Sequence, residues 1–533
     1  MKPQSYLSLL TAFMLLLAAV QATPIITEFM ASGSDAPADA DGDTPDWIEI
    51  YNPDDAAVAL AGYGLTDDQE MLQKWSFPEV TIESKGYLIV FASNKDRTSG
   101  ELHSNFELNG GGEYLALSAP DGTILSEFTY PEQRGDVSYG FFNEELQFFQ
   151  EATPSEANES GIDGFVADTK FSVNRGFYDE SFVLEITTET EGATIFYSID
   201  GTDPAKGSLF NPAEEYTEPL TIPTTTVVRA IAKKSGWQST NTDTHTYIFH
   251  NDVVNQSDQP DGFPERWGSH RSDYEMDPRI TGPNADKMID SLRSLPTISF
   301  VGDVSDFFGS KGIYTNSTSH GIEWERPISF EWINPDGSSK FQVDCGVRLQ
   351  GGAFRNYGLT DKKSFRLLFK NEYGVERLRH DIVNRPGAVS DFDTIIFRAG
   401  ANDGYAWGAA GTTVQYTRDE FGRRLAHEAG YHSNQGGFQQ LYINGVYWGL
   451  YNLAQRPNED FSASYYGGEA GDWDSINSGD VKNAGGAENG NDPNNSGLRD
   501  WQQYVRDAKG AETHADYMAL QGLNPDGTRN PNL

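Results

Sequence analysis

A short segment past the middle of the chain gathers positive charge around two consecutive glycines. Residues 346–380 hold three acids and eight bases, the bases being Arg348, Arg355, Lys362, Lys363, Arg366, Lys370, Arg377 and Arg379. The local charge of +5 contrasts with a net charge of −40 for the whole protein. Glycines let the backbone approach phosphate groups while nearby cations neutralise them. Gly351 and Gly352 therefore predict a phosphate-binding turn, and the alternative is that these bases only pair with acids of neighbouring domains.

Two other clusters resemble metal sites but fit the chemistry poorly. His427 and His432 flank a glutamate as in the zinc signature H-E-x-x-H, yet they are five residues apart, which separates them by about 140° on a helix. Four aspartates resemble a calcium loop, but the glycine and glutamate of an EF-hand are missing from it; they are Asp39, Asp41, Asp43 and Asp46. We expect a solvated acidic turn there, keep a Ca²⁺ site as the alternative, and assign no metal ligand.

Composition narrows the class of protein. The chain has 533 residues with 39 Lys+Arg against 79 Asp+Glu, which argues against a protein that binds nucleic acid. Aromatic residues make up 12%, so packed cores are expected. Cys345 is the single cysteine, which excludes an intrachain disulfide bond.

The N-terminus has the pattern of a secretory signal. Lys2 is followed by an apolar run over 7–20, and Val20 and Ala22 provide small residues before a cleavage site. We expect residues 1–22 to be a signal peptide and the mature protein to be secreted or bound at the cell surface. An uncleaved anchor is the alternative, although about 20 apolar residues are needed to span a membrane. No later run is long enough, so no transmembrane segment is expected.

Alternating apolar residues predict two β-sandwiches in the first half of the chain. Residues 23–140 alternate with a period of two between turn signals, which is typical of an all-β sandwich. Residues 141–164 lack a period and are interpreted as a linker. Residues 165–249 alternate again over a length that suits a small immunoglobulin-like sandwich.

The remaining residues, 250–533, predict an α+β domain that must position the glycine turn. Strands are expected near 297–301, 328–333, 343–350 and 365–369, and a hairpin around Asn444-Gly445. Residues 416–429 predict a helix with Phe421 and Leu425 on its apolar face. Residues 479–497 are expected to form a loop or lid.

Three stretches of sequence resemble known families. Residues 23–140, with 26–32, 46–52 and 65–68, look like a bacterial lamin-tail domain. Residues 168–249, with 197–204, resemble the C-terminal domain of chitobiases and β-hexosaminidases. From about 296, the runs 347–352, 362–367 and 442–453 are similar to the CotH family of atypical protein kinases, which resemble spore coat protein H. The order suits a large exported bacterial protein.

The CotH resemblance implies a nucleotide site with ATP and Mg²⁺ as cofactors. Gly351, Gly352 and Arg355 match the turn over the phosphates, and Lys363 matches the basic residue that contacts them, with Lys362 as a rival. Gln455 stands where family members commonly have a glutamate, in the strand that leads to the adenine. Either Glu420 or Glu428 is expected to pair with the lysine.

The resemblance also implies catalytic acids that the sequence does not supply. In the family they follow the hairpin near a Gly-Asn-x-Asp-Trp stretch, which does not occur before Leu533. We expect the catalytic residues to lie beyond Leu533 and interpret the chain as a fragment, with a degenerate family member as the alternative.

Three functions follow from these observations. The first is an exported kinase that acts on a protein substrate or cell-surface partner. The second is an adhesion or scaffold protein with a non-catalytic kinase-like domain. The third is a polysaccharide-binding accessory protein, suggested by Trp237 in the chitobiase-like sandwich.

Overall fold

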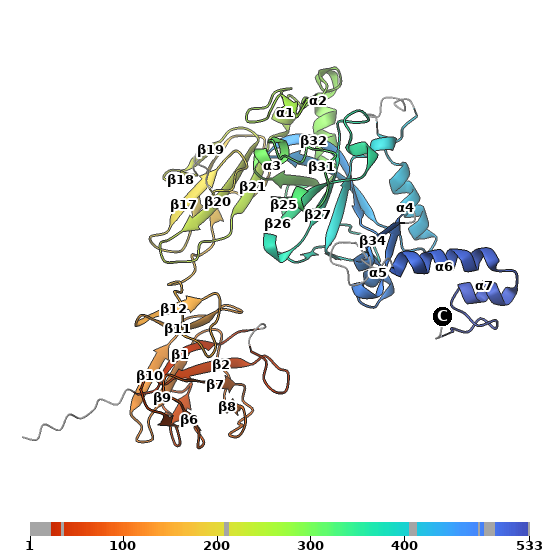
Figure 1. Ribbon diagram of the computed structural model, residues 1–533. Coiled ribbons are helices and arrows are strands. Elements are labelled where there is room, and N and C mark those ends of the chain that lie inside the picture. Colours follow the sequence, from red (N-terminus) through yellow and green to blue (C-terminus); the bar gives the residue numbers. More distant parts are fainter. Residues whose placement is uncertain are drawn as a thin grey trace, which may run out of the picture. The chain divides into compact units, whose positions relative to one another are not determined.

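The computed structural model divides the chain into two compact units. Unit 1 comprises Met1–Val166 and Lys233–Ser239, and unit 2 comprises Ala167–Ala232 and Thr240–Leu533 (Figure 1). The structure describes residues 23–33, 37–206, 213–404, 413–477, 480–483 and 496–530. The predicted signal peptide at 1–22 and most of the predicted loop at 479–497 lie outside these residues.

Unit 1 is a sandwich of two antiparallel-rich sheets. One sheet has the order β12-β11-β1-β2-β7-β8 and the other the order β10-β9-β4-β5. Their inner faces share one core that includes Phe29, Leu65 and Leu115. The strands are β1 (Ile25–Met30), β2 (Asp46–Tyr51), β4 (Gly64–Thr66), β5 (Trp75–Ser76), β7 (Tyr87–Ala92), β8 (Leu102–His103), β9 (Tyr114–Ser118), β10 (Ile124–Thr129), β11 (Ser138–Phe142) and β12 (Glu145–Phe149), with a small pair β3 (Val58–Ala59) and β6 (Thr81–Ile82).

The segment interpreted as a linker, 141–164, is instead part of this sandwich. β12 pairs with β11 along the edge of the first sheet. Beyond it, the backbone N–H of Ser155 donates to Glu49 at 2.6 Å, and the Thr153 hydroxyl donates to Glu28 at 2.8 Å. Both glutamates are fully buried. The segment therefore covers the outer face of the sheet. Its sequence lacks a period, so this position was not predicted.

Unit 2 begins with the second β domain, as predicted. Its main sheet has the order β14-β21-β20-β17-β18, and two-stranded pairs β13–β16 and β15–β19 accompany it. The strands are β13 (Lys170–Phe171), β14 (Gly176–Phe177), β15 (Phe182–Leu184), β16 (Ile186–Thr187), β17 (Thr194–Ser198), β18 (Glu214–Glu215), β19 (Leu220–Ile222), β20 (Thr226–Lys233) and β21 (Asp243–Ile248).

The rest of unit 2 is built on a closed barrel in the order β24-β25-β26-β27-β30-β32-β31. Phe300, Phe330, Phe365 and Phe397 fill its interior, each fully buried. Asn444 and Gly445 both have positive φ in the hairpin between β31 and β32, as a tight turn requires. The strands are β24 (Thr297–Val301), β25 (Arg326–Ile333), β26 (Ser339–Gln350), β27 (Ser364–Leu368), β30 (Thr394–Arg398), β31 (Gly436–Ile443) and β32 (Val446–Gln455).

Helices surround the barrel, which confirms the predicted α+β class. They are α1 (His250–Val253), α2 (Pro278–Arg293), α3 (Val304–Phe308), α4 (Arg418–Glu428), α5 (Glu459–Tyr466), α6 (Ser496–Gly510) and α7 (His514–Leu520). Short pairs add β22 (Arg266–Trp267) with β23 (His270–Arg271), β28 (Leu378–Arg379) with β29 (Asp391–Phe392), and β33 (Ser475–Asn477) with β34 (Asp480–Asn483). Within the described residues, no helix combines the length and apolar character needed to cross a membrane.

The apolar face expected for α4 is not buried. Phe421 and Leu425 are 65% and 58% exposed, whereas Glu420 and Arg423 on the same helix are buried. The helix packs through an ion-pair network instead of a hydrophobic stripe, so periodicity predicted the helix but the wrong buried face.

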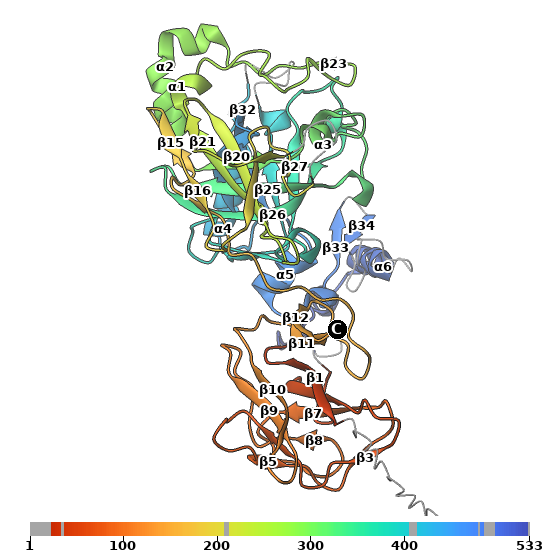
Figure 2. The ribbon, with the colours of Figure 1, turned by 90° about the vertical axis from the view of Figure 1, so that its left-hand side faces the viewer.

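The second sandwich lies against the barrel (Figure 2), and a buried carboxylate joins the two. Glu331 on β25 is fully buried, pairs with Arg175 Nε at 2.9 Å and accepts the Thr246 N–H at 3.0 Å. Ile248 of the sandwich and Ile333 of the barrel lie in one hydrophobic cluster. The sandwich and the barrel are therefore joined by both charge and apolar packing.

Candidate functional site

A cavity of about 1,200 Å³ lies where β26 and β32 end. Four arginines and the two consecutive glycines line it, and we call it the arginine-lined cavity; they are Arg348, Arg355, Arg366, Arg456, Gly351 and Gly352. It is large enough for a nucleotide-sized ligand.

Strand register brings two of these arginines together. Arg348 on β26 and Arg366 on β27 are direct partners across the antiparallel pair. Directly opposed residues point to the same face of a sheet, and like charges in such a pair repel. Arg456 follows the last residue of β32 and lines the same cavity. The arrangement is unfavourable for an empty protein and favourable for one that binds an anion.

Arg348 has a carboxylate partner close by. Its Nε donates to Glu325 at 2.6 Å. Glu325 is 8% exposed and also accepts from Lys370 at 2.7 Å and from the Tyr373 hydroxyl at 2.9 Å. Burial alone would raise the pKa of Glu325, but Lys370, Arg348 and Tyr373 outweigh it and lower the pKa. The carboxylate thus remains ionised and holds Arg348 in place.

Arg366 carries a charge that the protein does not neutralise directly. Its Nε donates to the Thr394 hydroxyl at 3.1 Å, and among the described residues no carboxylate oxygen lies within 4.0 Å of its guanidinium. Burial, followed by the charges of Arg456 and Arg348, lowers the pKa of Arg366 to about 9. The guanidinium is therefore still charged at neutral pH and faces the cavity.

The glycine turn at the end of β26 leaves room beside these arginines. Gly351 has φ +107°, a conformation that side chains disfavour, and a Cβ on either glycine would meet no atom within 4 Å. Arg355 follows in a short 3₁₀ turn, where its Nη1 donates to the Ser319 carbonyl at 2.8 Å. Gly351, Gly352 and Arg355 all line the cavity, where sequence reasoning placed them.

The two lysines proposed as phosphate contacts do not line this cavity. Lys363 is 1% exposed, and its Nζ donates to the Thr360 carbonyl at 2.5 Å and lies 4.0 Å from the Tyr357 ring centroid. Burial lowers the pKa of Lys363 to about 8. Lys362 reaches a different cavity, and its Nζ donates to the Leu450 carbonyl at 2.5 Å.

Gln455 also points away from the arginine-lined cavity. It is 2% exposed; its side-chain oxygen accepts the Gln435 N–H at 3.0 Å, and its amide donates to the Tyr465 hydroxyl at 2.8 Å. Because neighbours on a strand face opposite sides, the next residue, Arg456, is the one that lines the cavity. Gln455 fixes the end of β32.

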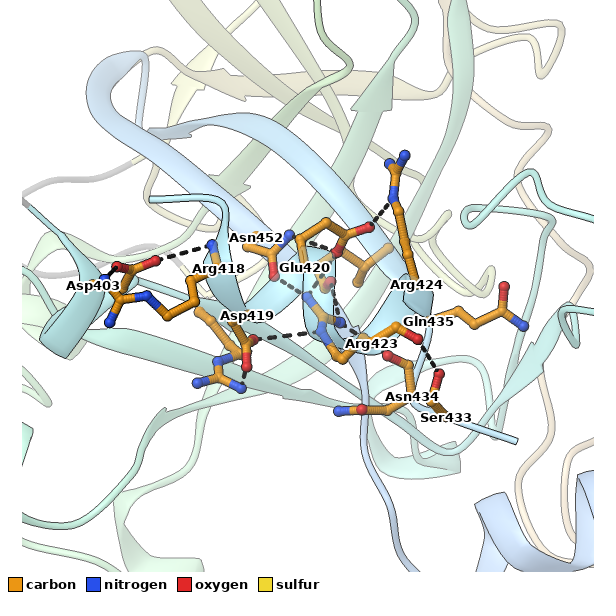
Figure 3. A network of polar contacts seen from close by, with 12 residues as sticks. Asp403, Arg418, Asp419, Glu420, Arg423, Arg424, Ser433, Asn434, Gln435 and Asn452 are labelled. Atoms are coloured by element: carbon orange, nitrogen blue, oxygen red, sulfur yellow. Dashed lines mark hydrogen bonds and ion pairs between the residues drawn. The ribbon is translucent and has the colours of Figure 1, made fainter. Parts of the chain in front are cut away.

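Neither candidate glutamate on α4 pairs with a lysine in the described structure. Glu428 is exposed. Glu420 is 4% exposed and forms ion pairs of 2.6–2.8 Å with three arginines, Arg385, Arg423 and Arg424. Asn452 on β32 adds a hydrogen bond to Glu420 at 3.2 Å (Figure 3). The helix is thereby tied to the barrel.

Sequence reasoning found the turn but not the arginines that matter most in the geometry. Arg348 lies two residues before Gln350, and Arg366 lies within the 362–367 motif. Two-residue alternation places Arg348 on the face of Gln350, and pairing of the two strands would have placed Arg366 beside it. The missing information was the register between β26 and β27, which cannot be read from the sequence.

The residues suggested for calcium and for polysaccharide are engaged inside unit 1. Lys95 Nζ lies 2.5–2.9 Å from carboxylates of Asp39, Asp41 and Asp43, so the lysine stands where a cation would bind. Trp237 has Lys234 Nζ 3.9 Å from its ring centroid and Gly164 packed against the same indole. A bound ion or sugar would have to displace these contacts.

Comparison with family models gives three matches along the chain. The Lamin Tail Domain matches residues 18–132, the Chitobiase/beta-hexosaminidase C-terminal domain matches 173–245, and the CotH kinase protein matches 347–521. A comparison of the chain with curated proteins finds no match. The CotH match contains the glycine turn, Arg348, Arg366 and Arg456. The chain therefore carries, in this order, a lamin-tail region, a chitobiase-type C-terminal region and a region of the CotH kinase family.

Proposed function

We propose that unit 2 is a kinase-like nucleotide-binding protein that holds the phosphates of ATP in the arginine-lined cavity. The observation that carries the proposal is the convergence of Arg348, Arg366 and Arg456 beside the Gly351-Gly352 turn. Arginine forms strong charge-assisted hydrogen bonds with phosphate oxygens. A triphosphate would reduce the repulsion between the opposed arginines, and its anionic oxygens would give Arg366 an ion-pair partner.

The residues present also fit a magnesium nucleotide. Mg²⁺ is usually bound by one or two carboxylates together with substrate phosphates. Asp474 is the carboxylate that lines the cavity among its described residues, so we propose it as the protein ligand. Bound there, Mg²⁺ would neutralise charge on the phosphoryl group that is transferred.

We further propose that the natural protein is exported and transfers phosphate to a protein partner. The CotH match supports a kinase-like activity. The apolar run before Thr23 supports export. Phosphotransfer requires catalytic acids, which the family resemblance places after the hairpin of β31 and β32.

Calorimetric titration of the full chain with ATP and Mg²⁺ tests the nucleotide site. Arg366→Gln should weaken binding about ten- to a hundred-fold, since a hydrogen bond to a charged group contributes about 1.5–3 kcal/mol. Arg379→Gln is the matched control, because it removes an equal charge from a side chain that is 74% exposed and outside the cavity. Absence of ATP binding, or equal losses in both variants, would refute the proposal and favour the scaffold function.

A further inference from the structure

Unit 2 has a second cavity, of about 530 Å³, that shares no lining residue with the arginine-lined cavity. Segment 267–288, which ends in α2, forms one wall, and residues 447–449 of β32 form the other. Asp361 and Lys362 close it between them. We call it the acidic cavity because four carboxylates line it; they are Asp273, Glu275, Asp277 and Asp361.

One wall of the acidic cavity is aromatic and apolar. The rings of Trp267 and Tyr274 lie 5.7 and 5.8 Å from the ring of Trp448. Trp267 Nε1 donates to the Tyr274 hydroxyl at 3.0 Å, and that hydroxyl donates to the Pro264 carbonyl at 2.9 Å. The polar atoms of these two rings are thus satisfied within the wall. Ile280 on α2, 54% exposed, extends the apolar surface.

The carboxylates differ in how the protein neutralises them. Asp361 pairs with His270 Nε2 at 2.6 Å, and Asp277 pairs with Arg279 at 2.6 Å. Asp273 and Glu275 have no basic nitrogen within 4.0 Å in the described parts of the chain. Partial burial, followed by the charges of Asp258 and Asp361, raises the pKa of Asp273, and the charge of Arg271 opposes this increase. An incoming cation would therefore find two carboxylates that lack a direct ion-pair partner.

Lys362 does not form an ion pair with Asp273 or Glu275, although it is the one lysine or arginine among the described lining residues. Its Nζ donates to the Leu450 carbonyl at 2.5 Å and to the Tyr416 hydroxyl at 2.6 Å. Gly449 makes room for it, since a Cβ there would lie 3.2 Å from the Nζ. These bonds hold the Lys362 ammonium in the wall of the cavity, and none of them goes to Asp273 or Glu275.

We propose that the acidic cavity binds a basic peptide segment, with a lysine or arginine side chain laid against Trp448 and Ile280, the accessible part of this wall. These side chains combine an apolar stem with a charged head, which matches an apolar wall bordered by unpaired carboxylates. Trp448 offers a ring that can attract the cation. A saccharide fits less well, because Trp267 and Tyr274 are only 3% and 4% exposed and cannot stack on a sugar ring. This proposal is independent of nucleotide binding.

Fluorescence anisotropy on the full chain tests it. The probe is a short labelled peptide that alternates leucine with lysine or arginine, and the reference peptide has glutamate at the basic positions. Asp273→Asn combined with Glu275→Gln should weaken binding of the basic peptide about two- to thirty-fold, since exposed charge pairs contribute about 0.2–1 kcal/mol each and two are lost. Both side chains are exposed, so the fold should be retained.

A matched control and a second variant make the result specific. Glu376→Gln with Glu428→Gln removes the same charge from exposed positions of unit 2 outside the cavity and should leave binding unchanged. Ile280→Lys places a fixed cation at the wall and should reduce binding more than the double neutralisation does. Absence of saturable binding, equal binding of the glutamate peptide, equal losses in the control pair, or competition by a chitin oligosaccharide but not by free basic peptide would each overturn the proposal.

Discussion

Unit 2 contains two groups of arginines whose contacts with carboxylates differ. Beside α4, Arg385, Arg423 and Arg424 surround the buried carboxylate of Glu420. In the arginine-lined cavity, Glu325 pairs with Arg348, while Arg366 faces the cavity with a hydroxyl as its hydrogen-bond partner.

The difference separates a structural charge from a functional one. Arg423 is 8% exposed and donates to Glu420 at 2.8 Å and to the Asn434 carbonyl at 3.0 Å, so groups of the protein itself compensate its charge (Figure 3). Arg366 is partly exposed and has the Thr394 hydroxyl as its hydrogen-bond partner, and in our proposal its charge binds the ligand. A count of bases along the sequence cannot distinguish the two, whereas the position of one carboxylate does.

Removing the carboxylate beside α4 should give the largest effect. Burial alone would raise the pKa of Glu420, but hydrogen bonds from Arg424, Arg385 and Asn452 and the charge of Arg423 lower it. Glu420→Gln should cost unit 2 about 3–5 kcal/mol in free energy of unfolding, because it takes the nearest carboxylate away from the buried Arg423 guanidinium, which keeps only a longer ion pair of 3.4 Å with Asp419 among the described residues. Denaturant unfolding checks this, with the exposed Glu428→Gln on the same helix as control. A loss below about 1 kcal/mol would show that the cluster is not structural.

Replacing a buried carboxylate that has no arginine partner should instead stabilise the protein. Burial raises the pKa of Glu49 in unit 1 to about 7. In the unfolded chain Glu49 has the ordinary glutamate pKa of about 4.5, so this group destabilises the folded state increasingly as pH rises from 4.5 to 7. Glu49→Gln should therefore gain about 2–3 kcal/mol relative to the native protein between pH 5 and pH 8.

Hydrogen-exchange protection of β1 and β2 in the full chain measures that difference, since these strands contain or adjoin Glu49. A stability difference between the variant and the native protein that does not change with pH would mean that Glu49 stays ionised, as Glu420 does.

The smallest effect is expected at the lysine that sequence reasoning favoured. Lys363→Met should change ATP affinity less than about two-fold, because the Lys363 ammonium is bonded to the Thr360 carbonyl and does not line the cavity. Titration calorimetry on the full chain, beside Arg366→Gln, makes the comparison direct. A ten-fold loss in Lys363→Met would return the phosphate contact to the lysine.

Local patterns predicted most of the strands of the barrel in unit 2. β24 occupies the expected residues 297–301, and the Asn444-Gly445 turn joins β31 to β32 as expected. These elements carry their own signals, namely runs of apolar residues and a dipeptide suited to positive φ. The glycine turn was predicted for the same reason.

Features that depend on pairing between distant segments were not predictable in this way. Arg348 meets Arg366 through strand register, and the acidic cavity combines segments around residues 273, 361 and 448. The buried face of α4 was predicted wrongly because Arg385, 35 residues earlier, provides part of the partner for Glu420. One sequence alone does not encode which distant charges meet.

The most direct test of the central claim is a calorimetric titration of the full chain with ATP, ADP, AMP and adenosine under one set of salt and Mg²⁺ conditions. If the arginine-lined cavity holds the phosphates, affinity should fall with each phosphate removed, and adenosine should bind at least about a hundred-fold more weakly than ATP, a difference of about 2.7 kcal/mol. Equal affinities for ATP and adenosine would contradict the account, because the arginines of the cavity would then contribute nothing to binding.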